Sequence, residues 1–454
     1  MERATMRMGA ALAWLMAGLA PARLAAQSWQ LPASDPVGIA RSGAGVAFGA
    51  NLEAASLNPA LLATLREDHS AFVAAGMELE SSQGTLQENQ MVLFSTNRNR
   101  SLVGFGSGFR LTPTLVWGLK LDQPFMRHVV MPLDYPGRFQ GQKLDLQTRR
   151  GEFQLGWAFR PDLAFGASLG LTQVKYAWDN MVRTTVDNPS TSSPLGLMES
   201  DLRQSGARTV PSYSLGFRWA VNSRWTFGGT YVGPIRANLS MSAGYGSAPA
   251  TFYNLSGYGA APVGTSTLGA AQQAATSAQA GGGTLVLPGK AVLGVRQRVN
   301  QVFTWEMDMA FIQGAQTRLP GDPSASYGSA SVSGPGGTNR FRNGYGINLM
   351  GELTLSKRWT ARIGAELETA LRQDEYVDPV LGGSKTSGLS AGFGFKMLGG
   401  ELNVGYQYRQ SQDADTPNLN GAWSHNSGYY TVPASTTRVE GMGHLWAVGF
   451  KEIF

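Results

Sequence analysis

Hydrophobic and polar residues alternate along most of the chain with a period of two. From Phe303 to Phe311 the odd positions are apolar or aromatic, whereas the even positions are small, polar or charged. The same alternation recurs over residues 359–368 and 401–409. Successive side chains of a β-strand point to opposite faces, so this period predicts strands with one apolar and one polar face. After Leu19 no apolar run approaches the length of a membrane-spanning helix.

The alternation predicts an all-β chain of fourteen antiparallel strands. They are expected over residues 69–82, 100–111, 115–126, 148–160, 163–178, 208–221, 224–242, 288–299, 302–315, 342–355, 359–372, 386–397, 400–411 and 440–454. An even number of strands allows an antiparallel sheet to close into a barrel, as in bacterial outer membranes. Trp117, Trp157, Trp219 and Trp359 lie near strand ends, where the aromatic girdle of such a barrel meets the membrane surface.

The connections between these strands alternate in length. Short ones fall at residues 112–114, 161–162, 222–223, 300–301, 356–358 and 398–399. Long ones fall at 83–99, 127–147, 179–207, 243–287, 316–341, 373–385 and 412–439. Short periplasmic turns with longer external loops are typical of transmembrane β-barrels. We therefore predict a closed barrel in the bacterial outer membrane, a monomer whose outer face contacts membrane lipid.

The two ends of the chain indicate export and assembly. Arg3 and Arg7 precede a short apolar run, and small residues then favour cleavage after Ala26, so residues 1–26 are predicted to be a signal peptide. At the other end, Phe454 closes an alternating strand. An aromatic last residue on such a strand resembles the signal that the outer-membrane barrel assembly machinery recognises, and we expect this machinery to be a partner.

Composition and spacing argue against several classes of function. The net charge is only +6 and is spread without a basic cluster, which gives no basis for nucleic-acid binding. The absence of cysteine excludes disulfides, a lipid-modified cysteine and thiolate metal sites. The four histidines have neither metal-ligand nor nucleophile-triad spacing. We therefore predict no catalytic residue, no metal site and no cofactor, so the protein is not expected to be an enzyme.

Residues 27–68 interrupt the pattern, because they do not alternate and are rich in Gly, Ala and Asn. Gly43 and Gly45 lie in the first part of this segment, and Asn58-Pro59-Ala60-Leu61 lies in the second part. Such a segment has two natural places, the periplasm and the lumen. A barrel of this size encloses a lumen that must be plugged if water and ions are to be excluded. We expect residues 27–68 to form a hatch inside a barrel made by residues 69–454.

The glycine-punctuated segment followed by Asn58-Pro59-Ala60-Leu61 resembles the hatch of the FadL-type family, outer-membrane transporters of long-chain fatty acids and aromatic hydrocarbons. Residues 123–125, 287–295, 358–364 and 443–454 resemble further family positions in the same order. The resemblance implies that external loops capture a ligand, that it passes to a lumen pocket beside the hatch, and that it leaves sideways at the third strand. The chain departs from the family at three positions. Arg41 stands where an aromatic residue is usual, and Met126 stands where a glycine is usual. Glu53 is a single acidic residue where the family often has two.

Proline at position 124 falls inside the third predicted strand. Proline has no N–H to donate to a sheet, so it breaks the ladder of hydrogen bonds. Together with the resemblance, this predicts a kink and a lateral gap at Asp122, Gln123, Pro124 and Phe125.

Two cations are predicted to bind a carboxylate. In the strand over 163–178 the apolar residues change from odd positions to even ones, which predicts a β-bulge near residues 172–173 that turns Lys175 toward the lumen. The resemblance implies cations near the ends of strands five and nine, and the nearest matches are Lys175 and Arg318. A solvated charge is the alternative for each of them.

These observations predict a passive outer-membrane channel for hydrophobic compounds, with long-chain fatty acids as the expected substrate. Capture by external loops, a hatch-gated lumen and lateral exit at strand three make up the expected mechanism. Two alternatives stay open at this point: a general porin, and a structural or adhesive barrel that acts through its loops. An N-terminal hatch argues against a porin, because a polar pore needs no such plug.

Overall fold

The computed structural model describes residues 33–48, 52–65, 67–86, 92–132, 141–187, 194–245, 251–254, 281–320, 325–327, 330–332, 341–372, 380, 384–397, 399–411, 414–416 and 437–453. The predicted signal peptide, residues 1–26, and Phe454 lie outside the described residues, so export and recognition by the assembly machinery stay predictions. Among the described residues, no helix has the length and apolar character needed to cross a membrane.

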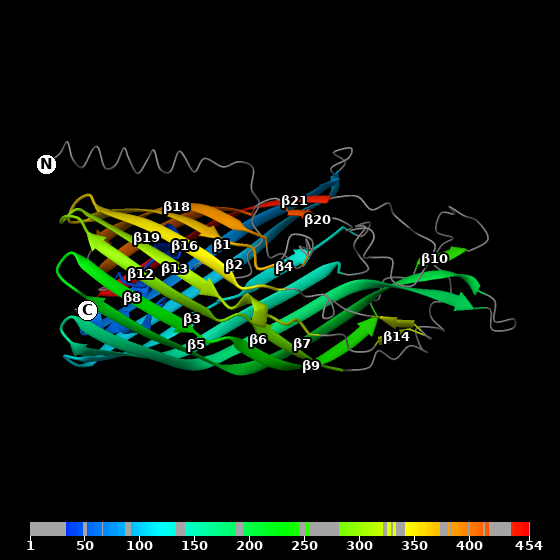
Figure 1. The fold of residues 1–454 in the computed structure, drawn as a ribbon, viewed down its shortest axis with the longest axis horizontal. Coiled ribbons are helices and arrows are strands. Elements are labelled where there is room, and N and C mark those ends of the chain that lie inside the picture. The colour runs from blue at the N-terminus through cyan, green and yellow to red at the C-terminus, as the bar shows by residue number, and fades with distance from the viewer. Residues whose placement is uncertain are drawn as a thin grey trace.

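The described strands form a closed antiparallel barrel with fourteen strands in its wall (Figure 1). Eleven of them are continuous: β1 (His69–Leu86), β2 (Val92–Thr112), β5 (Lys143–Arg160), β6 (Leu163–Asp187), β7 (Pro194–Ala220), β13 (Phe303–Ile312), β16 (Gly344–Thr354), β17 (Trp359–Glu368), β18 (Thr386–Met397), β19 (Gly400–Ser411) and β21 (Thr437–Ile453). Each pairs with its neighbours, and β1 pairs with β21 to close the ring. The predicted fold class is therefore confirmed.

The other three wall strands each consist of two pieces. They are β3 (Leu115–Asp122) with β4 (Met126–Val130), β8 (Trp225–Val232) with β9 (Ile235–Tyr245), and β11 (Gly281–Leu287) with β12 (Lys290–Arg298). A proline lies in each break, at positions 124, 234 and 288. Because proline removes one ladder hydrogen bond, these are the positions where a wall strand is interrupted at least cost.

The long connections contain more strand than predicted. Residues 179–187 of β6 pair with residues 194–203 of β7 as an extended hairpin, so the predicted loop over 179–207 is too long. A wall strand alternates because one face meets lipid and the other faces the lumen. The extended hairpin does not separate these two environments, so its strands can pair through the backbone without alternating. The short strands β10 (Thr251–Asn254), β14 (Ala325–Tyr327), β15 (Ala330–Val332) and β20 (Ala414–Thr416) lie at the same end of the barrel (Figure 1).

Three short helices of the N-terminal segment lie inside the barrel: α2 (Pro36–Ala40), α3 (Leu52–Ala55) and η1 (Pro59–Thr64). Helix α2 contacts β17, β18, β19 and β21, whereas η1 contacts β3, β5, β6 and β7 on the other side of the ring. Helix α3 contacts β1 and β2. A segment can contact strands from all around a closed ring only from its interior. We call the described residues 33–48 and 52–65 the hatch.

Glycines on the inward face of the wall make room for the hatch. A Cβ atom on Gly216 would lie 2.0 Å from the Asn58 side-chain oxygen, and one on Gly166 would lie 2.2 Å from the Ala60 nitrogen. Comparable close approaches to the hatch occur at Gly104, Gly156, Gly228, Gly364, Gly392 and Gly405 on six further strands. The hatch backbone therefore packs directly against the wall backbone, which accounts for part of the high glycine content of 58 residues.

The outer face of the barrel is apolar. Leu169, Val73 and Leu293 are 70%, 57% and 58% exposed, which a soluble protein would avoid over so large an area but a lipid-embedded wall requires. Close to the short turns, Trp219 packs on Phe227 and Trp359 packs on Phe395. These rings form part of the aromatic border expected where the barrel leaves the membrane.

The predicted β-bulge in β6 is wrong. The pairing of β6 with β5 and with β7 continues through residues 172–173 without a shift in register. Even-numbered side chains face inward along β6, from Ser168 to Trp178. The apolar residues change face because the surroundings change: the lower strand has lipid outside, whereas the upper strand encloses an apolar lumen. Lys175 therefore points outward.

Replacing Gly216 with alanine should displace the hatch, because the new methyl group overlaps the Asn58 side chain. The expected cost is about 1–3 kcal/mol, typical of overpacking in a filled interior. Single-channel recordings should show a larger ion conductance than the wild type. Gly346→Ala on β16 is a matched control, since its Cβ would meet nothing closer than 3.5 Å. Unchanged conductance in both variants would contradict the packing described.

Candidate functional site

Two carboxylates of β13 hold the hatch by its backbone. Asp308 accepts hydrogen bonds from the N–H groups of Gly45 at 2.8 Å and Val46 at 3.2 Å. Glu306 accepts one from the N–H of Ala47 at 2.7 Å. Both side chains are buried. They accept hydrogen bonds from backbone N–H groups of the hatch, a segment that has little secondary structure to pair these groups itself. Both predicted hatch glycines have positive φ angles, 76° at Gly43 and 153° at Gly45. Gly45 is the one that donates its N–H to Asp308.

Asn58 joins three parts of the molecule. Its side-chain amide donates to the carbonyl oxygen of Val46 in the hatch and to that of Phe217 in β7, at 2.7 and 2.9 Å. Its side-chain oxygen accepts the N–H of Ala60 at 3.0 Å, which caps the helix η1 that begins at Pro59. Leu61 is fully buried beneath it. An asparagine supplies both donors and an acceptor, and no other residue of its size does so.

Arg41 anchors the hatch on the opposite side. Its guanidinium lies 2.6 Å from Glu352 of β16, and Glu352 also accepts a hydrogen bond from Arg362 at 2.8 Å. The ring of Phe48 lies between Arg41 and Arg296, 3.8 and 4.4 Å from the two guanidinium carbons. The arginine that departs from the family pattern is therefore a buried ion-pair partner in this chain.

Beyond the hatch, toward the long loops, the lumen is lined by apolar side chains. They are Phe125, Val129, Met131, Leu144, Leu146, Val174, Tyr176, Trp178, Val210, Ile235, Ala237, Leu239, Met241, Leu285, Leu287, Leu319 and Val380. We call this group the apolar lumen cluster. On β5 the inward face changes from Glu152 and Arg150 beside the hatch to Leu146 and Leu144 above it. The charged side chains of the lumen on β5 thus lie beside the hatch, which also packs on apolar wall residues such as Phe72, Val116 and Met350, whereas the lumen above the hatch is apolar on this strand.

The third wall strand is irregular between Asp122 and Met126. Asp122 pairs with Arg150 of β5, and Met126 pairs with Gln147, so three residues of this strand face two residues of β5. This is the geometry of a β-bulge. Because of the extra residue, even-numbered side chains face inward in β3, whereas the odd-numbered Arg127 and Val129 face inward in β4. The change of face therefore occurs on strand three, at Pro124, and not on strand five.

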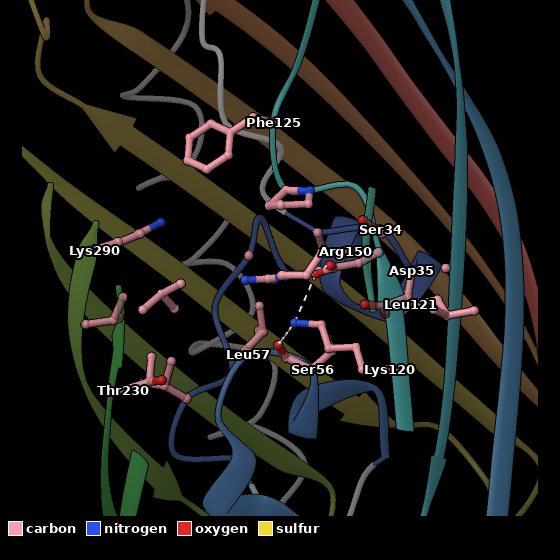
Figure 2. Close-up of a pocket in the computed structure, with 18 of the residues that line it drawn as sticks. Ser34, Asp35, Ser56, Leu57, Lys120, Leu121, Phe125, Arg150, Thr230 and Lys290 are labelled. Atoms are coloured by element: carbon pink, nitrogen blue, oxygen red, sulfur yellow. Dashed lines mark hydrogen bonds and ion pairs between the residues drawn. The ribbon is translucent and has the colours of Figure 1, made fainter. Parts of the chain in front are cut away.

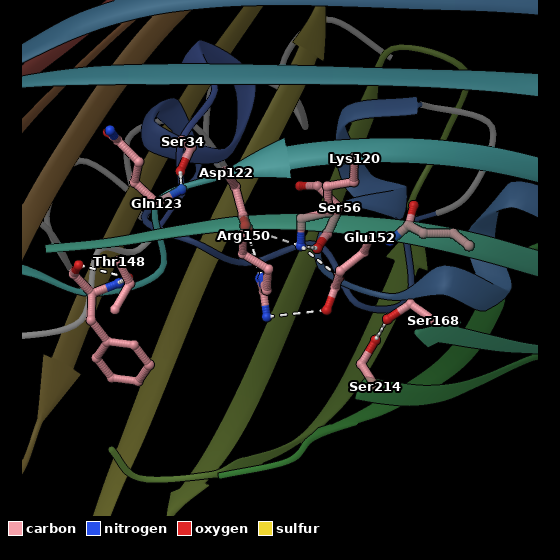
Figure 3. Close-up of polar contacts among 12 residues, drawn as sticks. Ser34, Ser56, Lys120, Asp122, Gln123, Thr148, Arg150, Glu152, Ser168 and Ser214 are labelled. Carbon is pink, nitrogen blue, oxygen red and sulfur yellow. Dashed lines mark hydrogen bonds and ion pairs between the residues drawn. The ribbon is translucent and has the colours of Figure 1, made fainter. Parts of the chain in front are cut away.

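Side chains replace the ladder bonds that are lost at this bulge (Figure 3). The Thr148 hydroxyl lies 2.8 Å from both the N–H and the carbonyl oxygen of Phe125. Arg150 makes two hydrogen bonds to Asp122, at 2.8 and 2.6 Å. Gln123 donates its N–H to the Ser34 hydroxyl of the hatch at 3.4 Å. The strand is thus interrupted without leaving its backbone unpaired on the β5 side.

On its other side the bulge separates β4 from β2. The ladder between β2 and β3 runs from Thr112 to Phe105, and within the described part of the chain no ladder continues it from β2 to β4. Arg100 of β2 donates a hydrogen bond across the separation to the carbonyl oxygen of Met126. The hatch fills the inner side, because the Ser34 carbonyl oxygen would lie 2.3 Å from a Cβ on Gly104.

A cavity of about 100 Å³ lies at this place (Figure 2). Inward-facing Lys120, Arg150 and Lys290 line it together with hatch residues such as Ser34, Asp35 and Leu57. Phe105 and Leu121, which belong to the outward face of β2 and β3, line it as well. Phe125 and Ile235 belong both to this cavity and to the apolar lumen cluster. The cavity therefore borders the lumen above, the hatch beside it and the outer face of the wall.

The two cations predicted to bind a carboxylate lie away from this cavity. Lys175 is exposed between the buried side chains of Val174 and Tyr176, and Arg318 is exposed between Thr317 and Leu319, which are buried. Both point away from the apolar lumen cluster. The side chain of Lys290 points into the cavity instead (Figure 2).

Lys290 was missed because it opens a strand whose alternation is weak. Its inward direction follows from the parity of Val292 and Gly294, which face the lumen on the same strand. Among the described residues the Lys290 side chain makes no hydrogen bond and no ion pair, although its charge interacts with the carboxylates of Asp308 and Glu368. It is therefore a lumen-facing cation whose ammonium group has no direct hydrogen-bond partner there.

A closed barrel in a lipid-facing wall, a hatch in its lumen and an apolar compartment above the hatch define a membrane channel for small molecules. The chain belongs to the family described as outer membrane protein transport protein (OMPP1/FadL/TodX), whose model matches residues 16–454. Members of this family are channels for hydrophobic compounds in the bacterial outer membrane, and they are not enzymes.

Solved structures agree on the fold. A Pseudomonas aeruginosa FadL homologue superposes with a TM-score of 0.73 at 15% identity, covering 94% of this chain and 100% of that one. The toluene transporter TbuX of Ralstonia pickettii gives 0.60 at 13% identity, and the toluene transporter TodX of Pseudomonas putida gives 0.57 at 13%, each with the same coverage. No curated protein matches the sequence directly.

Asp35 makes the hatch sensitive to pH. It caps helix α2 by accepting the N–H of Gly38 at 2.7 Å, but burial removes its carboxylate from water and raises its pKa to about 7. The folded hatch thus holds the proton more tightly than the unfolded chain does. Stability should fall as the pH rises from the ordinary pKa of 3.8 toward 7.

Asp35→Asn should abolish this dependence, because asparagine keeps the acceptor oxygen and cannot ionise. Thermal unfolding should show the variant gaining stability over the wild type at about pH 8, with little difference at about pH 4. Asp162→Asn, at an exposed turn, is the control and should follow the wild type. Parallel curves for Asp35→Asn and the wild type across this range would refute the assignment.

Proposed function

We propose that the protein is a passive uptake channel for hydrophobic compounds, with long-chain fatty acids as its substrates. The observation that carries this proposal is the cavity beside Pro124, because residues from the lumen and from the outer face of the wall line it together. A ligand would enter the apolar lumen cluster from the loop end and reach the cavity past Phe125 and Ile235. It would then leave between β2 and β4 into the lipid.

Lateral exit suits an apolar substrate. A hydrocarbon chain gains free energy, roughly 0.8 kcal/mol for each buried CH₂ group, when it leaves water for an apolar environment. A straight passage would carry it through the polar hatch region and into the aqueous periplasm. An exit at the third strand avoids the aqueous periplasm. The chain would pass from the lumen cluster along Phe125, Phe105 and Leu121, which line the cavity beside its charged residues, into the membrane. The same arrangement argues against a general porin, because the hatch occupies the polar part of the lumen.

Lys290 favours an acidic headgroup on this substrate. It is an inward-facing cation whose side chain makes no hydrogen bond or ion pair among the described residues, and it lies at the border between apolar lumen and cavity. A carboxylate placed there would form a charge-assisted hydrogen bond while its chain stays in the apolar cluster. Toluene, the compound named for two of the similar structures, has no group that would use such a cation.

Replacing Pro124 with valine tests the exit. Valine restores an N–H group and favours a regular strand, so the variant should be more stable and should take up a hydrophobic substrate more slowly. Uptake of a labelled long-chain fatty acid by cells expressing each variant measures this. Pro211→Val on β7 is the control, because Pro211 is exposed on a continuous strand. A Pro124→Val barrel with a regular third strand and normal uptake would exclude lateral exit here.

Replacing Lys290 with alanine tests the headgroup. Affinity for a fatty acid should fall by about 1.5–3 kcal/mol, the contribution of a hydrogen bond to a charged group. Affinity for an uncharged hydrocarbon of equal length should hardly change. Arg318→Ala, whose side chain points away from the lumen, should leave both affinities as they are. Equal losses for the acid and the hydrocarbon would show that Lys290 supports the wall rather than the ligand.

A further inference from the structure

The outward face of β5 and β6 changes from apolar to cationic within two positions. On β6, Leu169 and Leu171 are 70% and 60% exposed, and the next outward residues are Gln173 and Lys175. On β5, Phe153 is 48% exposed, and Arg149 follows two outward positions later. The exposed apolar residues mark the part of the wall that contacts lipid tails. Arg149 and Lys175 thus lie at the border of this part, on the side of the long loops.

These two cations are neighbours across the strand pair. Arg149 pairs with Gln173, and Lys175 lies two residues further along β6, which is the diagonal position. Side chains in this relation are roughly 7–8 Å apart at their bases, so both reach a common point between them. Within the described part of the chain neither side chain makes a hydrogen bond or an ion pair. Each therefore keeps its full capacity to bind an anion.

The surrounding groups are mixed. Gln147 and Thr209 face outward beside Lys175 and Gln173, and Gln147 donates a hydrogen bond to the carboxylate of Asp145 at 3.0 Å, so Asp145 is already engaged on the loop side of the two cations. Arg236 on β9 is exposed as well and donates to Gln316 at 3.4 Å. The far side of the ring differs, because the outward rings of Tyr406 and His444 are hydrogen-bonded to each other at 2.8 Å. The outward pair Arg149 and Lys175 thus has a neutral counterpart on β19 and β21.

We propose that Arg149 and Lys175 bind the phosphate group of a phosphorylated glycolipid in the outer leaflet. The acyl chains would lie along Leu169, Leu171 and Phe153, and the phosphate would sit where the apolar surface ends. Arginine binds phosphate through two parallel N–H groups, and lysine adds a compact charge. A soluble anion would not need the adjoining apolar strip, whereas a neutral lipid would leave both cations without a partner.

The site lies beside the interruption of the third strand. Arg149 is one of the two β5 residues that face the bulge at residues 123–125. A lipid held there would stand next to the separation between β2 and β4, on the outside of the wall. Binding of the lipid does not depend on transport, so failure of this proposal and failure of the proposed function are distinguishable.

Native mass spectrometry of the purified full-length barrel tests the site with diphosphorylated lipid A as the probe and dephosphorylated lipid A as its match. We expect the wild type to bind the phosphorylated lipid at least about ten-fold more tightly. The double variant Arg149→Gln/Lys175→Gln should lose this preference. Arg224→Gln/Arg358→Gln removes two exposed cations at the opposite, short-turn rim and should keep it. Heat-modified mobility on gels confirms that each variant is a folded barrel.

Three results would overturn the proposal. The first is equal binding of both lipids by the wild type, which would mean that only the apolar surface contributes. The second is an unchanged phosphate preference in the Arg149→Gln/Lys175→Gln variant. The third is competition by inorganic phosphate or by a delipidated phosphorylated sugar as strong as by the lipid, which would assign the two cations to a soluble anion.

Discussion

The structure depends on filling the lumen with a segment whose backbone groups find partners in the wall. Buried N–H and carbonyl groups must be paired, and the hatch has little secondary structure of its own to do this. The wall supplies the partners: Asp308 and Glu306 accept three hatch N–H groups, and Phe217 accepts the Asn58 amide. Glycines on the inward face allow the approach that these bonds require. A larger side chain at Gly216 would separate Asn58 from the wall, and the plug would no longer fit its barrel.

The surroundings of the wall strands change twice along their length, and the side chains differ accordingly. On the outer face, exposed apolar residues are replaced by Arg149 and Lys175. On the inner face, residues that contact the hatch are replaced, above Arg150, by the apolar lumen cluster. Apolar side chains therefore lie on the outer face of the lower strand and on the inner face of the upper strand. This arrangement carries a continuous apolar surface from the loop end to the cavity, which is what a channel for hydrophobic molecules needs.

The bulge at Pro124 lies where that surface meets the cavity, which residues of the outer face of the wall also line. Breaking a strand within a lipid-facing wall costs several kcal/mol for each unpaired backbone group unless other groups replace the lost bonds. Here Thr148 pairs with Phe125, and Arg100 donates across to Met126, so the interruption is stabilised on both sides. The interruption is therefore a fixed part of the wall, and Ser34 of the hatch contacts it on the inner side.

The sequence by itself determined the barrel, because a period of two, repeated in fourteen segments with alternating turns and loops, has few other solutions. It also predicted a break at Pro124, from the proline together with the family resemblance; proline alone does not decide this, because β7 continues through Pro211. It could not predict which face Lys175 takes, because the change of apolar positions in β6 has two explanations, a bulge or a change of surroundings. Nor could it find Lys290, whose inward direction follows from pairing with Ile312 and Val232 on neighbouring strands. Only the tertiary structure decided these points, because the face that a side chain takes is set by register between strands far apart in the chain.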